Sequence, residues 1–232
     1  MPRQLNPAWQ RKNVSSDHLA KVGARFLSDG PQAGQSAEGC QVISFLLVGS
    51  AQEWIVSDLC GVLTQRGRRS HWQNLATSHP QSEDDGVGAA LNAAQAAGSS
   101  FCLLATTSAA TLRRHRFNHL ILLVPASLDG VMTAYRRVKG MAGEDTPEIG
   151  VVIVGPRDQH AAWRYFRKLA VGTLRYLDVP LLNLGFLPQE VTPENGPPDH
   201  HRQNFLARIS ERLLSSGFHS PYSPATDTGQ AE

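Results

Sequence analysis

Cysteine, charge and long apolar runs are all scarce in this 232-residue sequence. The three cysteines, Cys40, Cys60 and Cys102, are an odd number at unrelated spacings. This pattern excludes a disulfide framework and a Cys-x-x-Cys metal site, and it is typical of a reducing compartment. The longest apolar runs, at 45–48 and 120–124, are far shorter than the ~20 residues of a membrane-spanning helix. The N-terminus MPRQLNPAWQRKN has no apolar stretch of the kind found in secretory signals, so we expect a soluble, cytoplasmic protein.

Charged residues make up 18% of the chain, where soluble proteins average roughly 25%. There are 22 Lys and Arg residues and 20 Asp and Glu residues, so the net charge is only +2. Such a balance gives no global sign of a nucleic-acid or membrane partner. The hydrophobic share of 41% excludes a wholly disordered chain. The length fits one domain with tails, because domains span about 100–200 residues.

The two ends of the chain differ in composition from its middle. Residues 1–40 are polar, apart from a stretch at 16–27 where Leu19, Val22 and Phe26 recur at helical spacing. We expect a flexible segment with a short amphipathic helix. Because so short a helix is marginal in water, these three side chains are candidates for binding either the chain's own domain or a partner. Residues 215–232 are rich in Ser, Pro, Gly and Thr and predict a disordered tail, which leaves 41–214 as the folded domain.

Short apolar runs alternate with helical patterns between the two ends. Continuous apolar runs predict strands that are buried on both faces, and strands that alternate with helices need right-handed crossovers. We therefore expect an α/β fold with a mostly parallel sheet and helices on both faces. Strands are expected at 42–48, 69–73, 101–105, 120–124, 149–154 and 181–184. Helices are expected at 53–65, 87–97, 111–117, 129–141, 159–176 and 199–214.

Ligands of open parallel sheets bind beyond the carboxyl ends of the strands, so the first strand–helix turn is the place to expect a phosphate site. That turn reads Gly49-Ser50-Ala51-Gln52-Glu53. A P-loop needs several glycines, a Lys for the phosphates and a Ser or Thr for magnesium. Here one glycine remains, there is no Lys, and Glu53 brings a carboxylate to the helix start where an anion would bind. The turn therefore predicts no phosphate site.

The order of these elements, together with several short motifs, resembles the MinD/ParA class of deviant Walker ATPases. The motifs are LTQRGRR at 63–69, AYRRVK at 134–139, YLDVP at 176–180 and LGFLP at 184–188. They are most similar to those of the flagellar-number branch, FlhG (FleN), and the likeness extends over 40–214. It implies a P-loop NTPase-like architecture.

The residues with which that family binds nucleotide are replaced in this sequence. By the resemblance, the P-loop Lys falls on Gln52 and the Thr that follows it on Glu53. The two aspartates that end strands fall on Asn74 and Ala105, and the Asn that contacts adenine falls on Gly155. Phosphoryl transfer depends on Lys and Mg²⁺ to stabilise charge. We therefore expect no catalytic residue, no nucleotide and no cofactor, and we interpret the chain as a pseudo-ATPase with a vestigial loop at Gly49, Ser50, Gln52 and Glu53.

Other polar constellations carry less information. His115 and His119 have helical i, i+4 spacing but no third ligand at a recognisable distance, so no metal is expected. Cys102 lies in an apolar run and is expected to be a buried hydrophobe rather than a nucleophile. The final helix at 199–214 is basic and amphipathic, but it coincides with the family's last core helix, and we expect it to pack on the sheet rather than on a membrane.

Basic residues cluster on consecutive expected helices. We interpret them as solvated, although a DNA-binding face, as in ParA-type relatives, is the alternative. The two main clusters are Arg113, Arg114 and Arg116, followed by Arg136, Arg137 and Lys139, and a third group is Arg164, Arg167 and Lys168.

The sequence thus favours a non-catalytic MinD/ParA-like protein that regulates or positions a polar or envelope-associated bacterial machine, such as the flagellum. Its expected partner is a protein: a second copy, an active relative or a machine component. Nucleic acid is not expected, and membrane contact is at most peripheral, by recruitment to the cell pole or the inner membrane. The alternatives are an active ATPase with an unusual nucleotide site, a cellulose-synthesis accessory protein of the same class, and a DNA-associated partitioning module.

Overall fold

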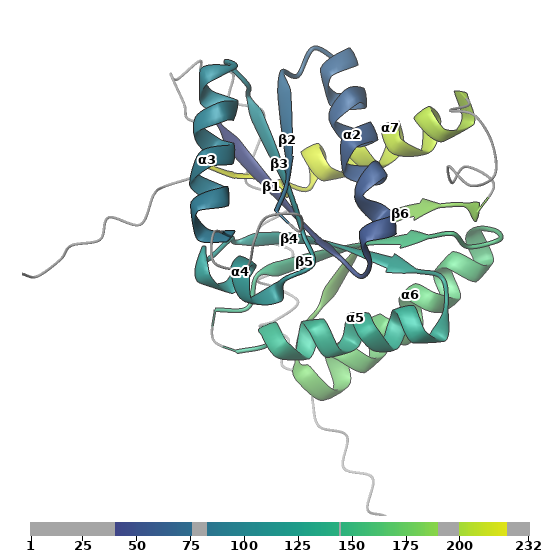
Figure 1. Ribbon diagram of the computed structural model, residues 1–232. Coiled ribbons are helices and arrows are strands. Elements are labelled where there is room, and N and C mark those ends of the chain that lie inside the picture. The colour runs from purple at the N-terminus through teal and green to yellow at the C-terminus, as the bar shows by residue number, and fades with distance from the viewer. Residues whose placement is uncertain (1–39, 76–82, 144, 190–199, 222–232) are drawn as a thin grey trace, which may run out of the picture. The chain divides into compact units, whose positions relative to one another are not determined.

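The computed structural model describes residues 40–75, 83–143, 145–189 and 200–221. These residues form a sheet of mainly parallel strands with helices on both faces (Figure 1). The strands are β1 (Gln41–Leu47), β2 (Ser70–Asn74), β3 (Phe101–Thr106), β4 (His119–Pro125), β5 (Glu148–Val154), β6 (Leu181–Leu187) and β7 (Ser220–Pro221). The helices are the short 3-10 helix η1 (Ser50–Gln52), α2 (Glu53–Gln65), α3 (Glu83–Ala96), α4 (Ala109–Arg114), α5 (Leu128–Met141), α6 (Gln159–Leu177) and α7 (His200–Ser215).

The strand order is β2-β3-β1-β4-β5-β6, and each neighbouring pair in this path is parallel. Only β7 runs the other way, paired with the start of β1. Strands such as β3 and β4 are buried on both faces, which is why they read as continuous apolar runs in the sequence. The expected α/β class with a mostly parallel sheet is confirmed.

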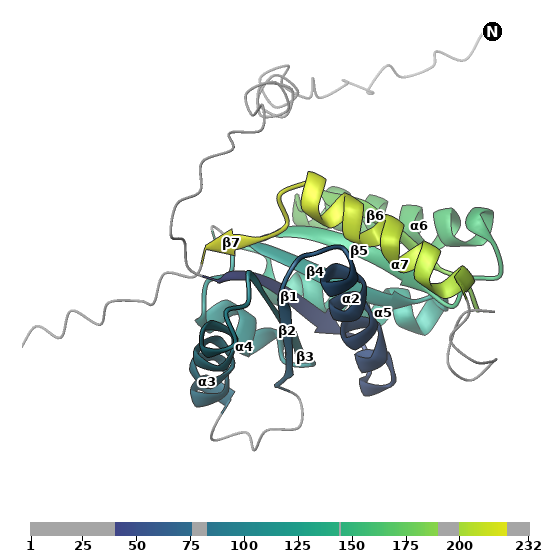
Figure 2. The same ribbon diagram turned by 90° about the horizontal axis from the view of Figure 1, so that it is seen from above.

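The two faces of the sheet are covered by different helices. On β1, Phe45 and Leu47 lie in a core cluster with side chains of α2 and α7, whereas Leu46 lies in a cluster with α4, α5 and α6. Successive side chains of a strand point to opposite faces, so α2 and α7 cover one face and α4–α6 the other. Figures 1 and 2 show α2 and α7 side by side on their face. The helix α3 covers a third cluster around β2 and β3.

Side-chain caps fix the starts of three helices. Ser108, Ser127 and Asp158 each accept a hydrogen bond from the backbone N–H three residues further on, at 3.2, 2.9 and 2.7 Å. These bonds satisfy N–H groups that have no partner inside the helix. They place the N-termini of α4, α5 and α6 directly after strands β3, β4 and β5, at the carboxyl edge of the sheet.

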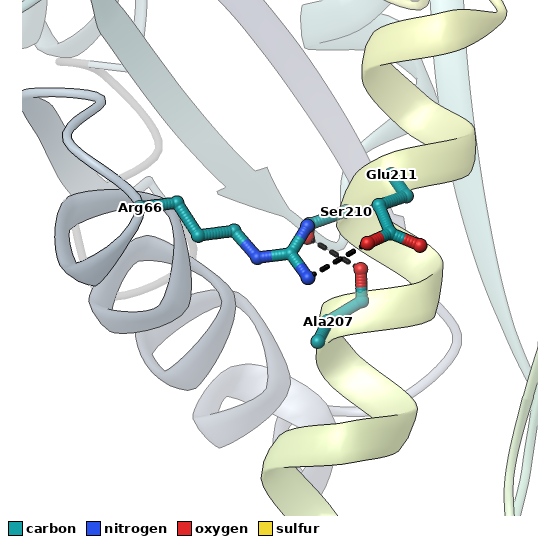
Figure 3. Close-up of polar contacts among 4 residues, drawn as sticks. All are labelled: Arg66, Ala207, Ser210 and Glu211. Carbon is teal, nitrogen blue, oxygen red and sulfur yellow. Dashed lines mark hydrogen bonds and ion pairs between the residues drawn. The ribbon is translucent and has the colours of Figure 1, made fainter.

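The helices α2 and α7 are joined by polar contacts. Arg66, at the C-terminal end of α2, donates to the Glu211 carboxylate at 2.9 Å, and the Ser210 hydroxyl donates to the Ala207 carbonyl at 2.7 Å within α7 (Figure 3). The other contact is less exposed: Arg202 pairs with Asp58 at 3.2 Å. Its guanidinium also lies 5.1 Å from the centre of the Trp54 ring.

All six expected parallel strands and their helices are present, with shifted ends. The helix expected at 87–97 begins at Glu83, and the strand expected at 181–184 continues to Leu187. The final helix packs on the sheet as expected, with Leu206, Ile209 and Leu213 buried. Within the described ranges, no helix combines the length and the apolar character needed to cross a bilayer.

The segment expected to be a disordered tail differs from that expectation in its first seven residues. Gly217, at φ +67°, ends α7 in the left-handed conformation, and the Phe218 N–H donates to the Leu213 carbonyl at 3.1 Å. Phe218 is then buried beside Gly150, where a Cβ atom would lie 2.9 Å from the Phe218 ring. The Ser- and Gly-rich composition concealed a helix C-cap. Residues 222–232, like the expected helix with Leu19, Val22 and Phe26, lie outside the described residues.

Candidate functional site at the carboxyl edge of the sheet

The vestigial positions occupy the ends of three strands. Asn74 on β2 and Ala105 on β3 are direct partners in the parallel register, and Ala105 is also opposite Phe45 on β1. The structure therefore brings Asn74 and Ala105 together next to the strand that leads into the β1–α2 loop. Gly155 follows β5, which is separated from β1 by β4, and it adopts φ +76°.

The side chain of Gln52 fills the β1–α2 loop from within. Its Oε1 accepts the Val48 N–H at 2.9 Å and the Gly49 N–H at 3.3 Å. Gln52 is only 5% exposed. A phosphate-binding loop presents its backbone N–H groups to the ligand. Here two of these N–H groups bind the side chain of Gln52, and this leaves a ligand fewer donors.

The loop turns directly into a 3-10 helix after Gly49. Gly49 is extended at φ −150°, and the 3-10 helix begins at the next residue, with the Gln52 N–H donating to the Gly49 carbonyl at 3.2 Å. A Cβ atom built on Gly49 would meet nothing within 4 Å. The single remaining glycine is therefore not required by close packing or by a left-handed backbone, as a phosphate-binding glycine would be.

The Nε2 atom of Gln52 is buried and has no hydrogen-bond partner in the described part of the chain. Such an unpaired donor costs free energy, on the order of 1–3 kcal/mol in mutational series. The two bonds accepted by Oε1 and the burial of the side chain offset this cost. Sequence reasoning placed Gln52 at the Lys position but gave no sign that its side chain turns back onto the loop.

Arg137 differs from the expected solvated patch. Its guanidinium is half-buried and donates to the Val48 carbonyl at 3.3 Å and to the Thr107 carbonyl, after β1 and β3. Burial lowers the pKa of Arg137 from its ordinary value. Val48 is thus bound twice, through its N–H by Gln52 and through its carbonyl by Arg137. A cation of α5 therefore contacts the backbone at the carboxyl edge of the sheet, and no motif in the sequence indicated this contact.

Other members of the basic clusters have different surroundings. Arg113 donates to the Gly140 carbonyl at the end of α5, at 3.0 Å, and so joins α4 to α5. Arg114, Arg116 and Arg136 are exposed. Arg116 has φ +48°, a left-handed conformation just after α4. The clusters therefore divide: some members hold the fold together, and others face solvent.

The two histidines at i, i+4 spacing do not share a helix. The helix α4 ends at Arg114, and His119 begins β4, where it pairs with Glu148 at 3.5 Å. The ring of His115 packs against Phe117. Among the residues that the structure describes, no group of three or more His, Cys, Asp or Glu could hold a metal ion.

Cys102 is fully buried between β1 and the α3 cluster, in agreement with the expectation of a small hydrophobe. Its hydrogen bond with the Cys40 thiol, together with burial, raises the pKa of Cys102 far above its ordinary value. The nucleophile would be the thiolate, and both the burial of this thiol and the direction of its pKa shift disfavour that form.

Comparison with solved structures identifies similar folds at low sequence identity. The MinD cell division protein of Aquifex aeolicus is 10% identical, with 76% of this chain and 97% of that chain covered and a TM-score of 0.51. MinD in the MinC:MinD complex of the same organism gives 10% identity, 76% and 96% coverage, and a TM-score of 0.52. A ParA family ATPase from Chlorobium tepidum gives a TM-score of 0.47 at 10% identity, with 77% and 93% covered, and carries no argument.

No protein-family model matches the sequence, and no curated protein sequence matches it either. The likeness to MinD therefore shows the fold alone. The chain has the P-loop NTPase-like architecture of MinD, and its own strand order is β2-β3-β1-β4-β5-β6. What the chain does must be argued from its own residues.

Proposed function

We propose that this chain is a non-catalytic protein with a MinD-like fold that positions or regulates a protein partner in an envelope-associated bacterial machine. The observation that carries the proposal is the Gln52 side chain, whose Oε1 accepts the two loop N–H groups at 2.9 and 3.3 Å. An ATP phosphate would have to displace that amide before it could bind there. It would gain no Lys cation in exchange, because Gln52 stands at the Lys position.

The surrounding positions support the same conclusion. The strand-end positions Asn74 and Ala105 offer an amide and a methyl group where a metal-dependent ATPase has carboxylates. Phosphoryl transfer relies on cations and metal ions to stabilise charge in the transition state. Arg137 is the cation nearest the loop by its contacts, and its guanidinium is engaged with the Val48 and Thr107 carbonyls.

A protein partner is the remaining role that suits this fold. One of the similar structures is a MinC:MinD complex, so MinD itself assembles with a protein. For this chain we propose binding through the N-terminal segment, with Leu19, Val22 and Phe26 as the contact residues. The flagellum is the favoured machine, and a cellulose-synthesis complex is the second candidate. Both rest on the resemblance of the sequence motifs.

A thermal-unfolding titration with ATP and Mg²⁺ tests the absence of nucleotide binding. A ligand at a hundred times its Kd stabilises a protein by about 2.7 kcal/mol, so binding would raise Tm visibly. The wild-type Tm should stay constant up to millimolar ATP. A saturable rise in Tm would contradict the proposal and favour the alternative of an unusual active ATPase.

Two variants make this titration specific to the loop. In Gln52→Lys the amide that fills the loop is lost and the P-loop cation is restored, so a small ATP-dependent rise in Tm is expected. The matched control is Gln65→Lys, the same substitution at an exposed position at the C-terminal end of α2, the helix that follows Gln52. If ATP raised the Tm of Gln65→Lys as much as that of Gln52→Lys, the effect would be non-specific and the role assigned to Gln52 would be wrong.

A further inference from the structure

Positive charge is concentrated on the helices of one face of the sheet. Across α4, α5 and α6, nine residues are Arg or Lys and only Asp129 is acidic. On the opposite face, α2 has two acidic residues and no cation, and α7 has three Arg and one Glu. The near-neutral net charge of the chain therefore hides a strong asymmetry. No composition argument could have revealed it, because it depends on which helices share a face.

The cations of α6 are directed to solvent. Arg164, Arg167, Lys168 and Arg175 are all exposed, and in the described part of the chain none of them has an acidic partner. The guanidinium of Arg175 lies 5.5 Å from the centre of the Tyr176 ring. Charges without partners attract an anionic surface more strongly than charges that are already paired.

The helices α5 and α6 also carry most of the exposed large apolar side chains. Of the seven found among the described residues, six lie on α5 and α6, and the seventh, Leu182, lies on the following strand, β6. Exposed apolar side chains scattered singly need no explanation, but their concentration at one place marks an interaction site. The six are Leu128, Met132, Trp163, Val171, Leu174 and Tyr176, with exposed fractions from 50% to 69%.

Apolar and basic side chains share one stripe of each helix. On α5 the stripe is Leu128, Met132, Arg136 and Lys139, and on α6 it is Trp163, Arg167, Val171 and Leu174. Both stripes have the spacing i, i+4, i+8, i+11, which keeps their members on one side of a helix. All eight residues are exposed.

The two stripes belong to one surface. The helices α5 and α6 pack side by side on the same face of the sheet (Figure 1). Their contact is close, because a Cβ atom at Gly172 of α6 would lie 3.7 Å from the Tyr135 ring of α5. We call the eight residues of the two stripes the α5–α6 face.

We propose that the α5–α6 face binds the surface of an anionic lipid bilayer. The charge of the face complements anionic headgroups, and its Leu, Met and Val side chains can enter the boundary with the acyl chains. Trp favours that boundary, and long basic side chains keep their charged ends at the headgroups while their stems contact apolar groups. A nucleic acid would use the cations but would gain little from exposed aliphatic side chains. The inference is independent of whether the chain binds nucleotide.

Flotation of the full chain with vesicles tests this surface. Vesicles of phosphatidylglycerol mixed with phosphatidylcholine should carry the protein upward at low salt, whereas vesicles of pure phosphatidylcholine should not. High salt should weaken binding, since it screens the charges. If the protein binds neither kind of vesicle, or binds both equally, the proposal is overturned.

Two pairs of variants separate the α5–α6 face from the rest of the molecule. Arg167→Glu on the α5–α6 face, combined with Arg164→Glu at a neighbouring exposed position of α6, should lower the partition coefficient about 25-fold or more, because each cation near an anionic surface contributes about fivefold. The matched control, Arg208→Glu with Arg212→Glu, makes the same charge change at exposed positions of α7, on the opposite face. It should bind at least several times more strongly than the α6 variant, and equal losses in the two variants would contradict the proposal.

The apolar side chains are tested with Val171→Gln and Leu174→Gln, which keep the charge and suit a helix. This variant should bind anionic vesicles several-fold more weakly and should retain its wild-type Tm, because both side chains are exposed. The same variants are then tested for retention of a DNA fragment. If the Glu variants lose DNA binding while vesicle binding stays unchanged in all of them, the face is a nucleic-acid interface and the lipid proposal is wrong.

Discussion

The two helical layers of this sheet have similar interiors but opposite exteriors. On one face, α2 and α7 are joined by two Arg–carboxylate pairs, and neither helix has a large apolar side chain exposed. On the other, the exposed cations of α6 have no acidic partner in the described part of the chain, and α5 and α6 together carry six exposed apolar side chains. Packing against the sheet cannot explain the difference, since both layers bury continuous apolar clusters. The exposed side of α2 and α7 has the composition of a solvent-facing surface, whereas the exposed side of α5 and α6 has the composition of an interaction surface.

The largest expected effect lies under the α2–α7 layer. Phe218→Ala should lower the free energy of unfolding by about 3–5 kcal/mol, because a ring only 2% exposed leaves a cavity between the two helices and the sheet. Leu174→Ala on α6, where the side chain is 55% exposed, should change it by less than about 0.5 kcal/mol. Urea unfolding of both variants measures the contrast. A loss below about 1 kcal/mol for Phe218→Ala would mean that the residues after α7 are not part of the core.

The side of α5 that faces the sheet is expected to be tightly packed, although the opposite side is exposed to solvent. A Cβ atom at Gly130 would lie 2.4 Å from the Pro125 carbonyl oxygen, so Gly130→Ala should destabilise by about 3 kcal/mol. The matched variant is Gly61→Ala in α2, where a Cβ atom would meet nothing within 4 Å. It should stabilise by about 0.5–1 kcal/mol, since alanine favours helix more than glycine does. Equal Tm values for the two variants would contradict this close approach.

A smaller effect is expected from the Arg202 contacts in the α2–α7 layer. Arg202→Ala should cost about 2 kcal/mol, because it removes the cation over Trp54 and leaves the Asp58 carboxylate without this partner. Arg167→Ala on α6 should be within about 0.5 kcal/mol of wild type, because Arg167 is exposed and has no acidic partner. Chemical denaturation of the two single variants measures both changes in the free energy of unfolding. Equal losses in the free energy of unfolding would contradict the difference between the α2–α7 surface and the α5–α6 surface.

The smallest effect is a dependence of stability on pH. Burial lowers the pKa of His219 below its ordinary 6.5. As pH falls below 6.5, the unfolded chain therefore takes up a proton before the folded chain does, and stability is lost until the pH reaches the lower, folded value. His219→Gln should make the free energy of unfolding less dependent on pH over this range, because the variant has no imidazole to protonate. The check is the free energy of unfolding of both proteins across this pH range. A larger loss in the variant than in wild type would show that the sign is wrong.

The fold could be predicted from the sequence because its signals are local and repeated. The segment at 53–65 has a helical period, and the run at 101–105 is a short, continuous apolar stretch bounded by Ser and Thr residues, as buried strands are. The C-cap at Gly217 escaped notice because its neighbours resemble a tail. The position of the loop at 49–53 follows from the sequence. The contacts inside the loop do not, because nothing in the order of the residues shows that the Gln52 side chain turns back to Val48. Arg137, contacting Val48 from 89 residues away, is non-local in the same way.

The central claim is that Gln52 occupies the donors that a phosphate would need. Amide hydrogen exchange of Val48 and Gly49, followed by NMR with and without ATP and Mg²⁺, tests it most directly. The account predicts that both N–H groups exchange slowly in the free protein, faster in Gln52→Leu, and that ATP changes neither their rates nor their chemical shifts. Fast exchange in the free protein that slows when ATP is added would contradict it.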